Sequence, residues 1–428
     1  MSSPTDRTPL LENGNGAHPP RPFFARLADS LKAEGQPSWL ASFRAFFFGS
    51  YLNILLVFVP LSAIAHYLDW DAGLRFGFSF IAIMPLAALL GFATEQLSLK
   101  LGQTLSGLLN ASFGNAVEII VGIAALLQGE LRIVQTSLLG SILSNILLVL
   151  GCSFLAGGIK YSESNFQVTA AQASSSLMTL ACITLVIPAA YHSAQSHGGI
   201  DAPANTTSIA HLVRSMDPKG DLGLELLDES SLQGLKIISR GTAILLLIVY
   251  MAYLLFQLKT HAHLYEAMGE EEEEEPEMNL WAAGTALLGV TVVTSFCADY
   301  LVASIEETAE RYHIPKPFIG LILLPIVANA AEHVTSVWMA MKNKMELTIG
   351  ICVGSSIQIA AFVVPLLVIV GWITGHDLTL FFADFETVVL FVSVLLVNFL
   401  IQDGKSNYME GLMLLTLYLV IALAFWVS

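Results

Sequence analysis

Two short segments, far apart in the chain, carry the same amide and acidic residues in apolar surroundings. The first is Gly114–Glu118 (GNAVE) and the second is Ala328–His333 (ANAAEH). One constant offset in residue number carries Asn115 onto Asn329 and Glu118 onto Glu332. The same offset, without a gap, carries Gly140-Ser141 onto Gly354-Ser355. Since the matching positions are polar residues or glycine, this recurrence predicts an internal repeat whose polar residues have a chemical function.

The repeated residues favour binding of a hard cation. Asn and Glu at positions i and i+3 share one face of a helix, so the two halves together would present two carboxylates and two amide oxygens. Calcium takes about 6–8 oxygen ligands, and two carboxylates neutralise its charge. The pattern contains no sulfur ligand and no pair of imidazoles, so it would bind zinc or copper poorly. The predicted metal ligands are Glu118 and Glu332, and the wider cation-binding set adds Asn115, Asn329, Ser141, Ser355 and Gln358, with Asn145 able to complete the shell.

The same carboxylates can bind protons. Two facing carboxylates that are poorly solvated have a raised proton affinity, so cation and proton would compete, which is the physical basis of an antiporter. An acidic side chain at the bilayer centre costs on the order of 3 kcal/mol, which argues against a purely structural pairing. Further candidates for proton coupling are His333, Glu95, Glu306 and Asp299. For these the alternatives are a hydrogen-bonded histidine and ordinary interface carboxylates.

The composition requires a membrane around these residues. The chain has 428 residues, of which 55% are hydrophobic and 13% charged, and its mean hydropathy is +0.68. Soluble domains have about 25% charged residues. These values exclude a soluble enzyme, a nucleic-acid binder with a basic face and a disordered chain. The predicted fold class is an all-α polytopic membrane protein.

Long apolar runs predict about eleven transmembrane helices. About 20 residues are needed to cross the hydrocarbon core as a helix. The runs are long and continuous and do not alternate, which favours helix over strand. They cover residues 45–68, 75–98, 105–127, 131–157, 167–192, 235–260, 279–303, 317–341, 345–371, 377–401 and 407–427.

The repeat segments fall in the third and eighth runs, which are separated by an odd number of crossings. The halves should therefore be inverted, with a pseudo-twofold axis in the membrane plane. The excess of Lys and Arg on one side places the N-terminus in the cytosol and the C-terminus in the lumen. The predicted organisation is a disordered cytosolic tail (1–44), a first helix (45–68), a five-helix repeat (75–260) with a luminal loop (193–234), an acidic cytosolic linker (261–278) and a second five-helix repeat (279–428).

One cluster of glutamates accounts for much of the net charge of −16. The acidic segment is predicted to lie in the cytosol, either as a regulatory segment that attracts cations or as a solvated linker kept extended by repulsion. Its members are Glu266, Glu270, Glu271, Glu272, Glu273, Glu274, Glu275 and Glu277.

Other features concern processing and location. The four cysteines, Cys152, Cys182, Cys297 and Cys352, lie in apolar runs and are interpreted as small buried hydrophobes. Leu10-Leu11 completes an acidic-dileucine sorting pattern, and Asn205 begins a glycosylation sequon that would face the lumen.

The repeated motifs, each followed by a Gly-Ser span, resemble those of the cation/proton exchanger family of CAX type. From about residue 40 to the end, the chain is similar to fungal vacuolar Ca²⁺/H⁺ exchangers. The resemblance implies that Glu118 and Glu332 form the Ca²⁺ site, that Asn115, Asn329 and His333 shape it, and that the acidic segment lies at the cytosolic mouth. It also implies a secondary active antiporter that moves cytosolic Ca²⁺ into a vacuole or other acidic organelle in exchange for H⁺.

Several alternatives stay open at this point. Manganese is also a hard cation, so Mn²⁺ is a second candidate cargo. A Na⁺/Ca²⁺-type exchanger would need additional sodium sites, and a cation channel usually builds its pore from several subunits. An enzyme is not expected, because no nucleophile-base set and no phosphate-binding loop is present. The expected partners are the lipid bilayer and the transported ions, with no nucleic acid and no cofactor, and the oligomeric state is open.

Overall fold

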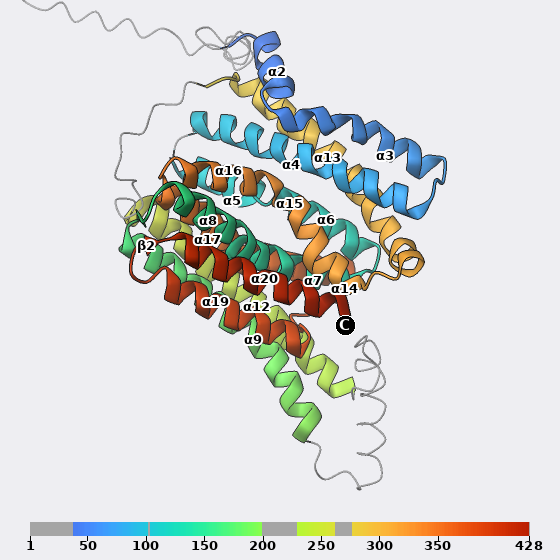
Figure 1. Cartoon of the computed structure of the whole chain (residues 1–428). Helices are drawn as coiled ribbons and strands as arrows, with labels where there is room; N and C mark the ends of the chain where they lie inside the picture. The colour runs from blue at the N-terminus through green and yellow to red at the C-terminus, as the bar shows by residue number, and fades with distance from the viewer. Residues whose placement is uncertain (1–36, 102, 199–228, 262–275, 428) are drawn as a thin grey trace, which may run out of the picture.

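The chain folds as a bundle of α-helices, seen in a computed structural model that describes residues 37–101, 103–198, 229–261 and 276–427 (Figure 1). Within these ranges, the strands are two residues long and form one antiparallel pair, with Ser164 opposite Ser406. Apolar segments adopt helices because a helix satisfies its backbone N–H and C=O groups internally, as hydrocarbon requires. The predicted all-α membrane fold is confirmed.

In the described parts of the chain, the helices are joined mostly by short connections. Most are α-helices; η1 is a 3₁₀-helix, and η2, η3, η5 and η6 are π-helical turns. The first part contains α2 (Trp39–Phe48), η1 (Tyr51–Val57), α3 (Phe58–Tyr67), α4 (Ala72–Leu101), α5 (Gln103–Phe113), α6 (Ala116–Leu127), α7 (Leu131–Leu143), η2 (Ser144–Val149), α8 (Leu150–Lys160), β1 (Ser164–Asn165), α9 (Val168–Gly198), α12 (Glu229–Leu255) and η3 (Phe256–Thr260). The second part contains α13 (Leu280–Tyr312), α14 (Lys316–Phe318), η5 (Ile319–Leu323), α15 (Leu324–Ala328), α16 (Ala330–Met341), α17 (Met345–Gln358), η6 (Ile359–Val363), α18 (Val364–Thr374), α19 (Asp384–Leu400), β2 (Lys405–Ser406) and α20 (Tyr408–Val427).

Each of the eleven predicted runs contains helix, but the count of eleven spans is not confirmed. In the described residues, seven helices are long and apolar enough to cross a membrane, or up to nine if each bent pair counts as one span. The third run is divided between α5 and α6. In the tenth run the helix begins only at Asp384, because Gly375 ends α18 in the left-handed conformation and a non-helical connection follows.

The repeat seen in the sequence is also a repeat of elements. α6 and α16 have the same length and are related by the offset that carries Asn115 onto Asn329, and so are α8 and α18. α7 and α17 begin at the same offset, and each continues into a π-helical turn, η2 or η6. Two stretches of the chain, 116–160 and 330–374, therefore fold alike without a gap.

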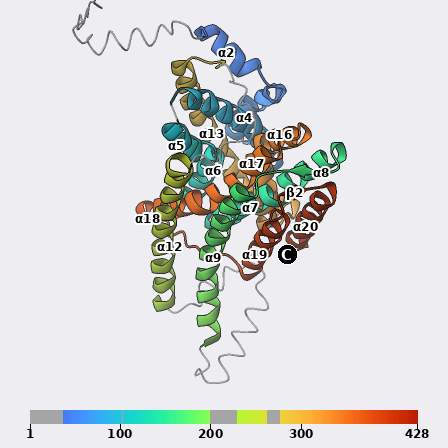
Figure 2. The same cartoon turned by 90° about the vertical axis from the view of Figure 1, so that its left-hand side faces the viewer.

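Helices from the two halves pack closely together. α4 and α13 lie side by side along much of their length (Figure 1), and α8 packs against α16 and α20. α9 and α12 lie next to each other and extend past the rest of the bundle (Figure 2). Three of the four cysteines, Cys182, Cys297 and Cys352, are buried in these packed helices as predicted, whereas Cys152 is partly exposed.

Gly140 allows a close helix contact near the centre of the bundle. A Cβ at this position would overlap the Leu321 carbonyl oxygen and would lie 2.6 Å from Pro325 Cγ. The Gly140→Ala substitution should therefore force α7 away from η5 and α15 and destabilise the fold by about 1–3 kcal/mol. Thermal unfolding in detergent measures this. The repeat partner offers the control, because a Cβ at Gly354 meets nothing within 4 Å; equal unfolding temperatures for the two alanine variants would contradict the prediction.

Candidate cation-binding site

Two asparagines break the helices that carry the repeated motifs. Asn115 lies between α5 and α6 (φ −113°, ψ 34°), and Asn329 lies between α15 and α16 (φ −89°, ψ 13°). In both residues ψ is positive, whereas an α-helix requires a clearly negative ψ. Each asparagine is therefore the N-cap of the helix that carries its glutamate, and the apolar run is interrupted there. Glu118 and Glu332 each lie in the first turn of a new helix, whose positive dipole end favours a buried carboxylate.

Each asparagine bonds to the Gly-Ser helix of the other half. Asn115 Oδ1 accepts a hydrogen bond from Ser355 Oγ (3.0 Å), and Asn329 Nδ2 donates to the Ser141 carbonyl oxygen (3.3 Å). Since Asn115 pairs with Asn329 in the repeat, and Ser141 with Ser355, the two contacts are reciprocal. Reciprocal contacts are the mark of a twofold relation.

A chain of side-chain hydrogen bonds extends this network around Ser355. Asn145 Nδ2 donates to Ser355 Oγ (2.9 Å), and Asn115 Nδ2 donates to Gln358 Oε1 (2.5 Å). Asn115, Asn145, Ser141 and Ser355 are all buried. The structure therefore brings together the polar residues that the sequence predicted, including Asn145.

Glu332 adjoins this network, and Glu118 lies near Glu332. Glu118 is 7% exposed, and the two carboxylates are close enough to repel each other electrostatically. Ser355 and Asn145 are hydrogen-bonding neighbours of the Glu332 carboxylate. Glu118 and Glu332 are therefore electrostatic neighbours.

Three side-chain oxygens of this region, one of them a carboxylate oxygen, are buried without a hydrogen-bond partner in the described part of the chain. They are Glu332 Oε2, Asn329 Oδ1 and Asn145 Oδ1. A buried acceptor that lacks a partner costs about 1–3 kcal/mol. A cation would satisfy these oxygens. In the described residues, no group of three or more His, Cys, Asp or Glu gathers, so the site combines two carboxylates with neutral amide and hydroxyl oxygens, a set that suits a hard cation.

The four candidates for proton coupling lie in different places. His333 is half-buried, next to Glu332 in the chain. Glu95 and Glu306 are exposed and occupy matching places, near the ends of α4 and α13. Glu306 accepts a hydrogen bond from Lys316 Nζ (2.9 Å). Asp299 is exposed and lies near His66. No described hydrogen bond or ion pair joins Glu306 or Asp299 to the buried carboxylates.

Glu95 lines a separate polar pocket together with Ser98, Leu99, Ser106 and Asn110. The end of the acidic segment is held by the neighbouring residue of α4. Gln96, the next residue along α4, is buried, and its Oε1 accepts hydrogen bonds from the backbone N–H groups of Glu277 (2.8 Å) and Met278 (3.1 Å). The other acidic-segment residues, Glu266 and Glu270–Glu275, lie outside the described residues, as do Leu10-Leu11 and Asn205.

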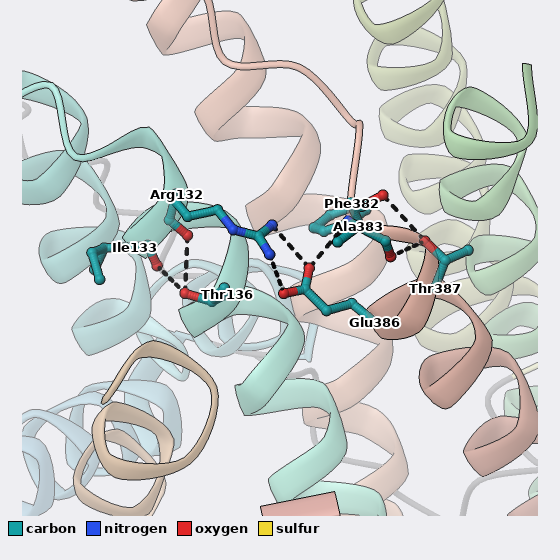
Figure 3. A network of polar contacts seen from close by, with 7 residues as sticks. All are labelled: Arg132, Ile133, Thr136, Phe382, Ala383, Glu386 and Thr387. Carbon is teal, nitrogen blue, oxygen red and sulfur yellow. Dashed lines mark hydrogen bonds and ion pairs between the residues drawn. The ribbon is translucent and has the colours of Figure 1, made fainter. Parts of the chain in front are cut away.

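One polar pair that the sequence did not predict joins the two halves at the start of α7 and of α19 (Figure 3). Arg132 donates from Nη1 to Glu386 Oε2 (3.0 Å) and from Nη2 to Glu386 Oε1 (2.5 Å). The Glu386 side chain is only 1% exposed, and its Oε2 also accepts the Ala383 backbone N–H (3.2 Å). The signal available in the sequence was a single arginine and a single glutamate at the edges of apolar runs.

These features define a polytopic membrane protein with an oxygen-rich, acidic candidate site between two repeated halves. The chain belongs to the sodium/calcium exchanger protein family, whose model matches residues 72–259 and 282–427. It is 48% identical to the vacuolar calcium ion transporter of Schizosaccharomyces pombe, over 88% of this chain and 85% of that protein. It is 41% identical to the Ca²⁺/H⁺ antiporter of Aphanothece halophytica, over 87% of this chain and 95% of that protein.

A solved structure supports the same grouping. The Ca²⁺/H⁺ antiporter protein YfkE is 32% identical, with a TM-score of 0.68 over 90% of this chain and 100% of that chain. The resemblance to vacuolar exchangers that the motifs predicted is therefore confirmed.

Proposed function

We propose that this protein is a secondary active antiporter that exchanges Ca²⁺ for H⁺ and moves cytosolic Ca²⁺ into the vacuole or another acidic organelle. The observation that carries the proposal is the pair of carboxylates, Glu118 and Glu332, beside buried oxygens that lack partners. The names of the relatives, a vacuolar calcium ion transporter and two Ca²⁺/H⁺ antiporters, support the same cargo and coupling ion.

Competition at one site couples the two ions. Without a cation, the carboxylates of Glu118 and Glu332 repel each other in a poorly solvated place, and protonation relieves both effects. With a cation bound, the negative charges are used as ligands and the protons are released. Occupation by one ion therefore excludes the other.

The two halves supply the means of alternating access. We place the N-terminus in the cytosol and the C-terminus in the lumen, with the halves inverted. Inverted halves can move against each other about a fixed central site, which opens it to one side at a time. The residues proposed to handle protons or the approaching cation are His333, Glu95, Glu306, Asp299 and the acidic segment from Glu266 to Glu277.

A proton gradient can supply the driving force. Each proton that moves down one pH unit releases about 1.4 kcal/mol. Two or three protons over roughly two units give about 5–8 kcal/mol, equivalent to about four to six powers of ten in cation concentration. This is enough to clear cytosolic Ca²⁺ into an acidic compartment.

The test is Ca²⁺ uptake into sealed vesicles that contain the protein and hold an imposed acid-inside pH gradient. Uptake should follow the pH gradient and should collapse on addition of a protonophore. A sodium gradient of equal size, imposed without a pH gradient, should drive no uptake, and Mn²⁺ added outside tests whether a second hard cation competes. Uptake that follows sodium instead of protons would overturn the proposed coupling.

A further inference from the structure

A cavity lies against the cation site on one side of it. Glu118 lines it, and so do two hydroxyl residues of α7, Ser137 and Ser141. Its other walls are apolar and come from α4, α6, α7, α13 and α15, with Ile83, Leu301 and Leu324 among them. Glu332 and Asn329 are not among the lining residues. The cavity thus touches the site from the Glu118 side.

The connections of the helices give the direction of this cavity. α6 runs away from Glu118 to Leu127, and α7 begins at Leu131 and returns, so Ser137 lies one turn closer to that end of the bundle than Ser141 does. The same end holds the connection from α13 to α14, because Lys316 Nζ lies 4.0 Å from Glu130 Oε1. The proposed orientation makes this end luminal.

The chemistry of Ser137 suits a cation that passes through. Its Oγ donates a hydrogen bond to the Val134 carbonyl oxygen (3.1 Å), which leaves the oxygen lone pairs free to act as acceptors. Ser137 and Ser141 are four residues apart and so share one face of α7. Calcium needs about 6–8 oxygen ligands throughout its path. In a cavity with mainly apolar walls, hydroxyls beside a buried carboxylate would replace part of its water shell.

The Ser137 hydroxyl has no counterpart in the second half of the repeat. The repeat offset carries Glu118 onto Glu332 and Ser141 onto Ser355, but it carries Ser137 onto Ile351. Ser137 lies in the cavity toward the end of the bundle that holds the connection from α6 to α7, so its hydroxyl lies to one side of the central network.

We propose that Ser137, with Ser141 and the Glu118 carboxylate, forms a cation subsite on the luminal side of the central site, through which Ca²⁺ passes to and from the lumen. This inference rests on the proposed function. It makes Ser137 a cation ligand for one face of transport, with no part in the affinity for cytosolic Ca²⁺.

The test measures half-saturation by Ca²⁺ separately on each face of sealed vesicles of one orientation. Uptake under an acid-inside gradient gives the cytosolic value, and release from vesicles loaded with graded Ca²⁺ under the reversed gradient gives the luminal value. Ser137→Ala should raise the luminal value about three- to tenfold, the effect of losing one oxygen ligand, and leave the cytosolic value unchanged. Ser137→Thr, which keeps the hydroxyl, and Ile351→Ala, the repeat-partner control, should both resemble the wild type.

The proposed subsite would be overturned if Ser137→Ala changed neither half-saturation concentration of Ca²⁺, or if it changed both equally. A failure of the proposed function is distinguishable, because wild-type vesicles would then show no proton-driven exchange at all. A second variant gives independent evidence. Ser137→Cys should react with a membrane-impermeant, positively charged thiol reagent from the lumen and not from the cytosol, above the background of the wild type; reaction from the cytosolic face alone would contradict the assignment.

Discussion

Ca²⁺ uptake driven by a pH gradient should fall by about 100- to 1,000-fold when either Glu118 or Glu332 is replaced by Gln. Each substitution keeps the shape of the side chain but removes one of the two negative charges that would face the cation in the proposed site. Loss of one partner from a buried set of charges costs about 3–5 kcal/mol, which corresponds to two to three powers of ten or more in occupancy. It also removes a group that would carry protons. Both effects act on the same uptake rate, measured in sealed acid-inside vesicles.

The matched control is Glu310→Gln. Glu310 is an exposed glutamate on α13, near Lys316 and outside the buried network. Its replacement removes the same charge from the protein and should leave uptake close to that of the wild type. The amount of protein in the vesicle membrane is measured for each variant, so that loss of uptake is not confused with loss of protein. Wild-type uptake in either the Glu118 or the Glu332 variant would show that the cation does not depend on the carboxylate pair.

The sequence predicted the members of this site because polar and acidic side chains have a high free-energy cost within a membrane. Amide and acidic residues in apolar runs need a reason, and one common offset pairs Asn115 with Asn329 and Glu118 with Glu332. The pairing of α6 with α16 and of α8 with α18 follows from the same offset. These predictions depended on residue type and spacing, which are local and visible.

What the sequence did not reveal depends on backbone conformation and tertiary packing. The apolar runs predicted from the sequence extend across Asn115 and Asn329, so the boundaries of those runs do not mark the helix breaks there. The late start of α19 at Asp384 has the same origin, because apolar residues, Leu380–Ala383, directly precede the helix. The cavity beside Ser137 arises where several separate elements meet, and no segment of the chain contains it.

The ion pair between Arg132 and Glu386 was hidden for a similar reason. The two residues are 254 positions apart, and they do not obey the repeat offset. Only the packing of α7 against α19 brings them together. Sequence patterns identify groups that need partners, whereas the choice of partner is a property of the folded bundle.

Breaking this pair should destabilise the protein strongly. Arg132→Met leaves the Glu386 carboxylate buried, at 1% exposure, with its charge uncompensated. The expected cost is about 3–5 kcal/mol, seen as a lower midpoint of thermal unfolding in detergent. Lys236→Met is the control, because it breaks a pair with Asp377 in which both side chains are more than a third exposed, and such pairs contribute about 0–1 kcal/mol.

The double variant Arg132→Met with Glu386→Met separates the cost of an unpaired charge from the value of the contact itself. If the cost comes from leaving a carboxylate without its partner in a dry place, replacing both residues by apolar ones of similar size should recover most of the lost stability. The double variant should then unfold at a higher temperature than Arg132→Met alone. Equal losses in the single and double variants would instead mean that the guanidinium stabilises the junction of α7 and α19 through its own packing and hydrogen bonds, and that the charge of Glu386 is tolerated there without it.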